Sequence, residues 1–149
     1  MSEFLKIFEN SVIWTAIIGW FVAQVLKVIF VFVKHKRLDF RRFVGSGGMP
    51  SSHSSTVMAL STATGLVEGF SSTVFAVSLV LAMVVMYDAA GVRRAAGQQA
   101  KILNKIVEDW GKASPADTEK KLKELLGHTP VEVFAGAILG IIIALIRHI

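Results

Sequence analysis

The chain has 149 residues, of which 53% are hydrophobic and only 18% charged, and its formal net charge is +5. This composition is too apolar for an ordinary soluble domain of this length and indicates a membrane protein. The chain has no cysteine, which excludes disulfides and thiolate chemistry, and in a membrane protein a positive excess favours contact with anionic lipid over nucleic acid.

Four apolar segments follow one another along the chain, at 12–33, about 54–67, 72–90 and 131–146. The first would be about 33 Å long as a helix, against a hydrocarbon core of roughly 30 Å. The second is short, but the polar residues before it can extend it, and residues 68–71 make the turn to the third. No strand, repeat or domain boundary is evident. We therefore expect one all-α domain over 1–149, an integral membrane helical bundle with about four transmembrane helices.

A polar region at 91–128 separates the third and fourth apolar segments and contains two amphipathic pieces. One ends near Trp110, and the other begins at Ser114-Pro115 and stops at Gly127, with the capping residues typical of helix ends. Amphipathic helices of this kind lie in the membrane interface. We expect the insert at 101–127 to be helical and to lie on the bilayer surface.

The basic residues predict the orientation of the chain in the membrane. Four crossings put both termini on one side and the 34–55 and 91–128 regions on the other. Of the sixteen Lys and Arg residues, five fall in 34–55 and eight in 91–128. By the positive-inside rule, that face is cytoplasmic. The expected location is therefore the cell membrane, with the site facing the cytoplasm and both termini opposite.

The stretch GSGGMPSSHSS, residues 45–55, lies just before the second apolar segment. A glycine-rich turn that leads into a helix presents backbone N–H groups and the positive end of the helix dipole, which bind phosphate. Ser51 and Ser52 could donate to such an anion, and His53 adds a proton donor. The alternative is that Pro50 and Ser51 only begin a transmembrane helix.

A second histidine, His128, precedes the last apolar segment. Thr129 as N-cap, Pro130 at the first helical position and Glu132 two residues later match a capping box. Glu132 could instead orient the His128 imidazole through one ring nitrogen, so that the other could attack phosphorus. One glutamate could do both.

Further charged and polar residues lie near or within the spans. Asp88 and Arg93 are costly near a membrane unless they are paired or functional, and the planar guanidinium of arginine suits phosphate oxygens. Arg94 is better explained as a membrane anchor. Lys27 lies inside the first span, where it could reach the interface, but Gln24 one turn earlier favours a polar stripe that faces inward.

Three stretches, GGMPSSHSS, DAAGVRRAAGQQAKILN and GHTPVEVFAGAILG, resemble the signature motifs of the divergent PAP2 family, which is related to type 2 phosphatidic acid phosphatases and vanadium haloperoxidases. The resemblance implies a nucleophile, an acid and an orienting carboxylate at His128, His53 and Glu132. It also implies a phosphate site that is made by Lys27, Ser51, Ser52 and Arg93. Supporting positions in the second motif would be Asp88, Gln99 and Asn104.

The resemblance implies a membrane lipid phosphatase that hydrolyses a phosphomonoester or pyrophosphate through a phosphohistidine, with no cofactor or metal. The expected partners are the bilayer and a lipid phosphate: phosphatidylglycerophosphate, phosphatidate or a polyprenyl pyrophosphate. No nucleic acid is expected, and the oligomeric state is open, a homo-oligomer included. The alternatives are a non-catalytic phospholipid-binding protein on the same fold and a vanadate-dependent haloperoxidase. The chain departs from the wider superfamily in having Ser52 where a glycine is usual and no Arg-Pro pair after Lys27.

Overall fold

The computed structural model describes residues 5–36, 48–110 and 128–149, without the side chains of 34–35, 92–96 and 107–110. Within these ranges the secondary structure is helical and no strand occurs, so the expected all-α class is confirmed. The elements are η1 (Lys6–Glu9), α2 (Ser11–His35), α3 (Ser52–Glu68), α4 (Thr73–Ala90), α5 (Val92–Trp110) and α6 (Pro130–His148).

Short polar residues set the starts of the bundle helices. Asn10 caps α2 by accepting hydrogen bonds from the Val12 and Ile13 amides at 3.0 and 3.1 Å. Ser72 caps α4 through the Phe75 amide at 3.2 Å. Each cap satisfies backbone N–H groups that have no partner inside the helix. The helices therefore begin within a few residues of the predicted positions.

Helix α3 is the centre of the bundle and packs against α2, α4 and α6. Its buried residues are all small: Ser52, Ser54, Ser55, Ala59, Ser61, Ala63, Thr64 and Gly65. Small residues allow helix backbones to approach closely, which is the usual way that helices associate in a membrane. The central position of α3 explains why this helix is less apolar than the other three.

Three glycines of the neighbouring helices meet α3 at close range. A Cβ added to Gly19 of α2 would lie 2.9 Å from the Ala59 Cβ, and the Gly19 carbonyl accepts a 2.8 Å hydrogen bond from the Ser55 hydroxyl. A Cβ on Gly136 or Gly140 of α6 would collide with backbone carbonyls of α3. The helices are therefore in contact through their backbones.

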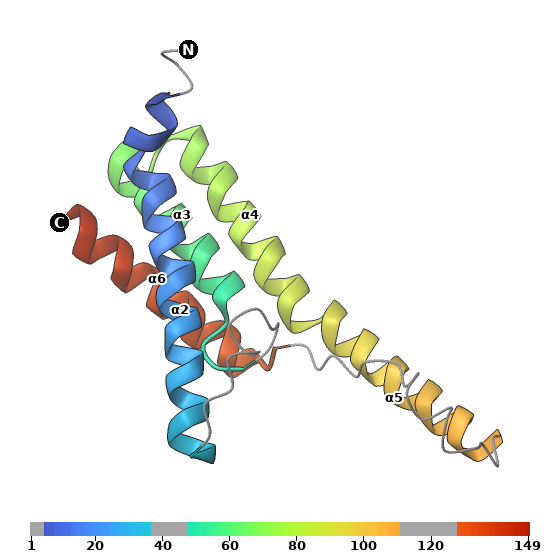
Figure 1. The fold of residues 1–149 in the computed structure, drawn as a ribbon. Helices are drawn as coiled ribbons and strands as arrows, with labels where there is room; N and C mark the ends of the chain where they lie inside the picture. The colour runs from blue at the N-terminus through green and yellow to red at the C-terminus, as the bar shows by residue number, and fades with distance from the viewer. Residues whose placement is uncertain (1–4, 37–47, 111–127) are drawn as a thin grey trace.

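The four long helices of the bundle alternate in direction (Figure 1). Near one end of the bundle, the Thr15 hydroxyl of α2 lies 2.9 Å from Nε2 of His148 at the end of α6. At the opposite end, the His128 amide before α6 donates to the Ala89 carbonyl of α4 at 3.2 Å. The start of α2 and the end of α6 therefore lie at the same end of the bundle.

The described ranges contain three helical segments that are long and apolar enough to cross a membrane: 11–33, 73–90 and 130–148. The expected fourth segment is α3, which has 17 residues, about 25 Å of helix, and many serines. The chain runs along α2 to one end of the bundle and begins α4 at the other end, so α3 carries it back. This connection is the one that the four-crossing prediction requires.

Helix α5 follows α4 after a break at Gly91 and leads away from the other helices (Figure 1). Its sequence is amphipathic, and the apolar side chains of Ile102, Leu103 and Ile106 are exposed. The first amphipathic piece of the predicted insert is thus a helix that ends at Trp110, as expected. The second, at 114–127, lies outside the described residues.

Candidate functional site

The two histidines that the sequence singles out lie next to each other. His53 is in the first turn of α3, and His128 immediately precedes the cap of α6. Their ring centroids are 6.0 Å apart, with an angle of 66° between the planes. His128 is only 1% exposed. At this separation, both imidazoles can reach one phosphoryl group.

Glu132 binds the His128 imidazole and caps its own helix with the same oxygen. Its Oε2 lies 3.2 Å from Nδ1 of His128 and accepts a 2.9 Å hydrogen bond from the Thr129 amide. The Glu132 amide in turn donates to the Thr129 hydroxyl at 3.3 Å, which completes the capping box. Glu132 therefore both caps α6 and contacts the His128 imidazole. Because Glu132 contacts Nδ1, the ring is oriented with Nε2 as its second functional atom.

Lys27 extends into the bundle instead of reaching out to the interface. It is 2% exposed, and its Nζ donates a 3.0 Å hydrogen bond to the Ser52 hydroxyl. Ser52 directly precedes His53 at the start of α3, so the lysine is held at the helix end that carries this histidine. Gln24, one turn earlier on α2, is also buried, so the predicted inward polar stripe is confirmed.

Ser51 and Ser52 have different roles. The Ser51 hydroxyl caps α3 by accepting from the Ser54 amide at 3.3 Å, and the Ser51 amide donates to the Glu132 carbonyl at 2.9 Å. Ser51 therefore caps α3, as the capping alternative predicts, and its amide also joins the start of α3 to α6. Ser52 instead holds Lys27. The serine that replaces the usual superfamily glycine thus provides the oxygen atom that binds the lysine.

The remaining predicted site residues belong to α4 and α5. Asp88 is exposed in the last turn of α4. Arg93 is in the first turn of α5, with its side chain outside the described part. Gln99 is exposed and Asn104 is buried, and both belong to α5, which leads away from the bundle (Figure 1). Their supporting role stays a prediction.

The cluster of His53, His128, Glu132, Lys27 and Ser52, hereafter the polar cluster, combines two imidazoles and an ammonium group with one carboxylate. Among the described residues, no group of three or more His, Asp or Glu side chains could hold a metal ion. Imidazole and ammonium groups bind and protonate oxyanions, so the polar cluster suits a phosphoryl group.

Sequence reasoning did not identify the glycines that bring this site together. A Cβ added to Gly136 would collide with the Ser51 carbonyl, and one added to Gly140 would collide with the Ser55 carbonyl one turn further along α3. The four-residue spacing of these glycines is a known signal for close packing of membrane helices. It was present in the sequence stretch GAILG at 136–140.

Comparison with known proteins agrees with the helical membrane fold. The sequence model of the divergent PAP2 family matches residues 8–143. An "uncharacterized membrane protein YuiD" from Bacillus subtilis (strain 168) is 42% identical over 152 aligned residues, which cover 95% of this chain and 96% of the relative. No solved structure matches the chain.

Proposed function

Because this chain belongs to the divergent PAP2 family, and because its polar cluster pairs an oriented imidazole with a second imidazole and a buried ammonium group, we propose that it is a membrane lipid phosphatase. The observation that carries the proposal is the contact between Glu132 and Nδ1 of His128, whose ring centroid lies 6.0 Å from that of His53. A histidine nucleophile needs such an orienting group. The substrate is a phosphomonoester or pyrophosphate of a lipid.

In the first step, Nε2 of His128 attacks phosphorus in line with the leaving oxygen. The new P–N bond forms as the P–O bond to the lipid breaks, and protonated His53 transfers its proton to that oxygen. Glu132 stabilises the positive charge that develops on the attacking imidazole. The products are the free lipid alcohol, or the lipid monophosphate if the substrate is a pyrophosphate, and phosphohistidine.

In the second step, water attacks the phosphohistidine while neutral His53 takes up one of its protons. The P–N bond breaks, its electron pair returns to the His128 nitrogen and phosphate leaves. Lys27 and the helix start at Ser52 neutralise the charge on the phosphoryl oxygens in both steps. Arg93 is proposed to join them through its guanidinium. None of these steps involves a cofactor.

The proposed site faces the cytoplasm. Thirteen of the sixteen basic residues belong to the 34–55 and 91–128 regions, which flank the helix ends that carry the polar cluster. The exposed apolar face of α5, at Ile102, Leu103 and Ile106, would rest on the inner leaflet with its lysines toward anionic headgroups. A lipid made on that side, phosphatidylglycerophosphate or phosphatidate, is therefore favoured over an outward-facing carrier pyrophosphate.

The test is release of phosphate by purified protein from phosphatidylglycerophosphate, phosphatidate and undecaprenyl pyrophosphate, with and without excess chelator. We expect turnover of at least one lipid that survives chelation and is inhibited by vanadate, which mimics the transferring phosphoryl group. His53→Ala should slow turnover by about 10²–10⁴-fold, as for loss of a general acid.

The same experiment separates the alternative functions. Binding of these lipids without phosphate release from any of them would favour a non-catalytic phospholipid-binding protein, since kinship of fold does not establish chemistry. Bound vanadium together with peroxide-dependent halogenation would favour a haloperoxidase. Activity that is lost in chelator and restored by magnesium would contradict the proposed mechanism.

A further inference from the structure

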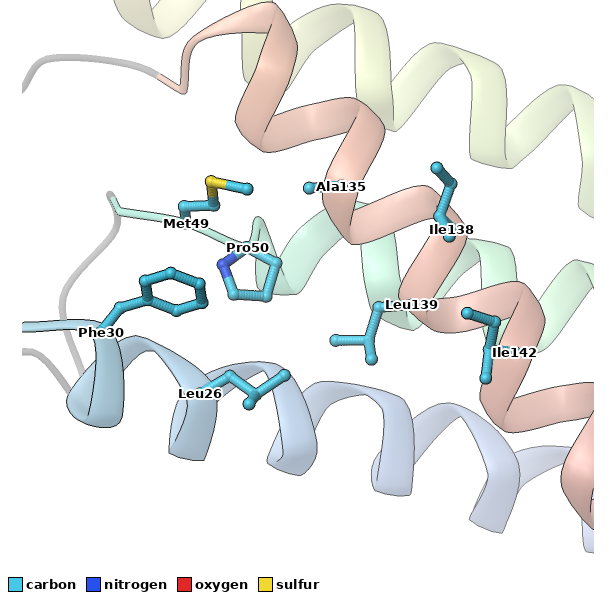
Figure 2. A pocket seen from close by; sticks show the side chains of 8 residues that line it. All are labelled: Leu26, Phe30, Met49, Pro50, Ala135, Ile138, Leu139 and Ile142. Atoms are coloured by element: carbon cyan, nitrogen blue, oxygen red, sulfur yellow. The ribbon is translucent and has the colours of Figure 1, made fainter. Parts of the chain in front are cut away.

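An apolar groove runs between α2 and α6, next to the segment that leads into α3 (Figure 2). Its volume is about 240 Å³. Leu26 and Phe30 line it from α2, Pro50 from the segment before α3, and Leu139 and Ile142 from α6. The side chains that line it are all apolar, so the groove suits an apolar ligand.

The groove adjoins the polar cluster through neighbouring residues of the chain. Leu26 precedes Lys27 on α2, and Pro50 precedes the two serines at the start of α3. The segment before α3 also packs on the lysine: a Cβ added to Gly48 would lie 4.0 Å from the Lys27 Cγ. The segment before α3 therefore both lines the groove and approaches the aliphatic part of Lys27.

The groove is directed toward the middle of the membrane. Its lining on α6 extends from Ala135 to Ile142, about 10 Å along a helix that runs away from the histidine end. Both α2 and α6 are long and apolar enough to span a bilayer, and Phe30 and Ile142 are partly exposed at the groove. The groove thus opens sideways, where the surrounding medium is hydrocarbon.

We propose that this groove holds an acyl chain of the lipid phosphate whose headgroup binds at Lys27 and Ser52. The proposal rests on the proposed function and specifies its substrate as a lipid that enters sideways from the bilayer. An acyl chain fits an apolar groove that opens to hydrocarbon and shares the segment before α3 with the polar cluster. The groove adds little affinity, because the chain exchanges one apolar environment for another. Its effect is to position the phosphoryl group between the two histidines.

Positioning of this kind affects the rate of reaction, and misplacement of a substrate by about 1 Å can lower a rate by about 100-fold. Leu139→Trp places a large side chain in the groove. We expect it to lower turnover of long-chain phosphatidate in vesicles by about tenfold or more. Turnover of water-soluble dihexanoyl phosphatidate should stay near that of the wild type, since its short chains need less of the groove. The matched control is Val77→Trp, at an exposed position of α4, which should change neither substrate.

A second measurement does not depend on turnover. Phosphatidate that carries a diazirine in the middle of one acyl chain is added at low mole fraction to phosphatidylcholine vesicles containing the full-length protein. After photolysis, labelled peptides are mapped. We expect label on Leu26–Phe30 and on residues 135–142, reduced by Leu139→Trp and by Lys27→Ala. Phosphatidylcholine with the same diazirine chain should label the apolar surfaces of α2, α4 and α6 evenly.

The two measurements distinguish failure of the groove from failure of the proposed function. Headgroup-dependent labelling of the groove without phosphate release would support the acyl-chain site and overturn the phosphatase. Phosphate release together with even labelling, unaffected by Leu139→Trp, would support the phosphatase and overturn the acyl-chain site. Equal labelling of the groove by phosphatidate and phosphatidylcholine would also overturn it, because the phosphate would then play no part.

Discussion

Replacement of Gly136 by alanine tests the backbone contact that joins the two halves of the site. Gly136 lies one turn after Glu132 on α6, against the start of α3. An added Cβ would collide with the Ser51 carbonyl and lie 3.0 Å from the Ser54 Cβ. A backbone carbonyl cannot rotate aside as a side chain can, so α3 and α6 would have to move apart.

The expected change in the free energy of unfolding combines two opposing contributions. Overpacking usually lowers the free energy of unfolding by 1–3 kcal/mol, and contact with rigid backbone favours the upper end, about 3 kcal/mol. Alanine in place of glycine inside a helix restores about 1 kcal/mol through its better helix propensity. The net loss should therefore be about 2 kcal/mol. The hydrogen bond from the Ser51 amide to the Glu132 carbonyl, 2.9 Å long, should weaken, and turnover should fall with it.

The assay is reversible unfolding of the purified protein in mixed micelles, monitored by tryptophan fluorescence. The control, Val131→Ile, adds one carbon atom to an exposed side chain of the same helix and should leave stability within about 0.5 kcal/mol of the wild type. If Gly136→Ala is as stable as the wild type or more stable, α3 and α6 do not approach each other as described.

Three further predictions concern the charge and the orientation of the site. Lys27→Met removes the ammonium group that donates to Ser52; turnover should fall by about 10²–10³-fold while the protein still folds, and retained turnover would show that Lys27 does not neutralise the phosphoryl charge. Glu132→Gln should lower turnover while keeping an oxygen for the helix cap, whereas Glu132→Ala should also lose about 1 kcal/mol of stability; equal stability of the two variants would contradict the double role. Single cysteines at Ser71 and Lys101, both exposed, should differ in their reactivity with membrane-impermeant thiol reagents in intact cells. Ser71→Cys should react and Lys101→Cys should not. The reverse pattern would mean that the topology is inverted.

Local signals in the sequence were sufficient to predict the helices and the capping box of α6, whereas the grouping of the polar-cluster residues came from the resemblance to the divergent PAP2 family. Thr129, Pro130 and Glu132 form the expected capping box because each residue acts on its near neighbours along the chain. The turn at Gly69 could also be predicted, because glycine favours turns, and its φ of 89° in the structure is one that suits glycine. The inward direction of Lys27 followed from its position one turn after Gln24.

Features that depend on contacts between distant helices were harder to predict. No local pattern indicates that Ser51 would bind the Glu132 carbonyl while its neighbour Ser52 binds Lys27, because both pairings depend on how α3 lies between α2 and α6. The groove at Leu26 and Leu139 could not be predicted from the sequence for the same reason. Its residues are typical of any transmembrane helix, and only the packing of the bundle leaves space between them.

The central claim is that His128 carries the phosphoryl group during turnover. The most direct test is rapid acid-free quenching of the purified protein with lipid labelled by radioactive phosphate, followed by peptide mapping. The account predicts an acid-labile, alkali-stable phosphohistidine at His128, which disappears in His128→Ala together with turnover. Turnover by His128→Ala, or radioactive phosphate on a different residue, would contradict it.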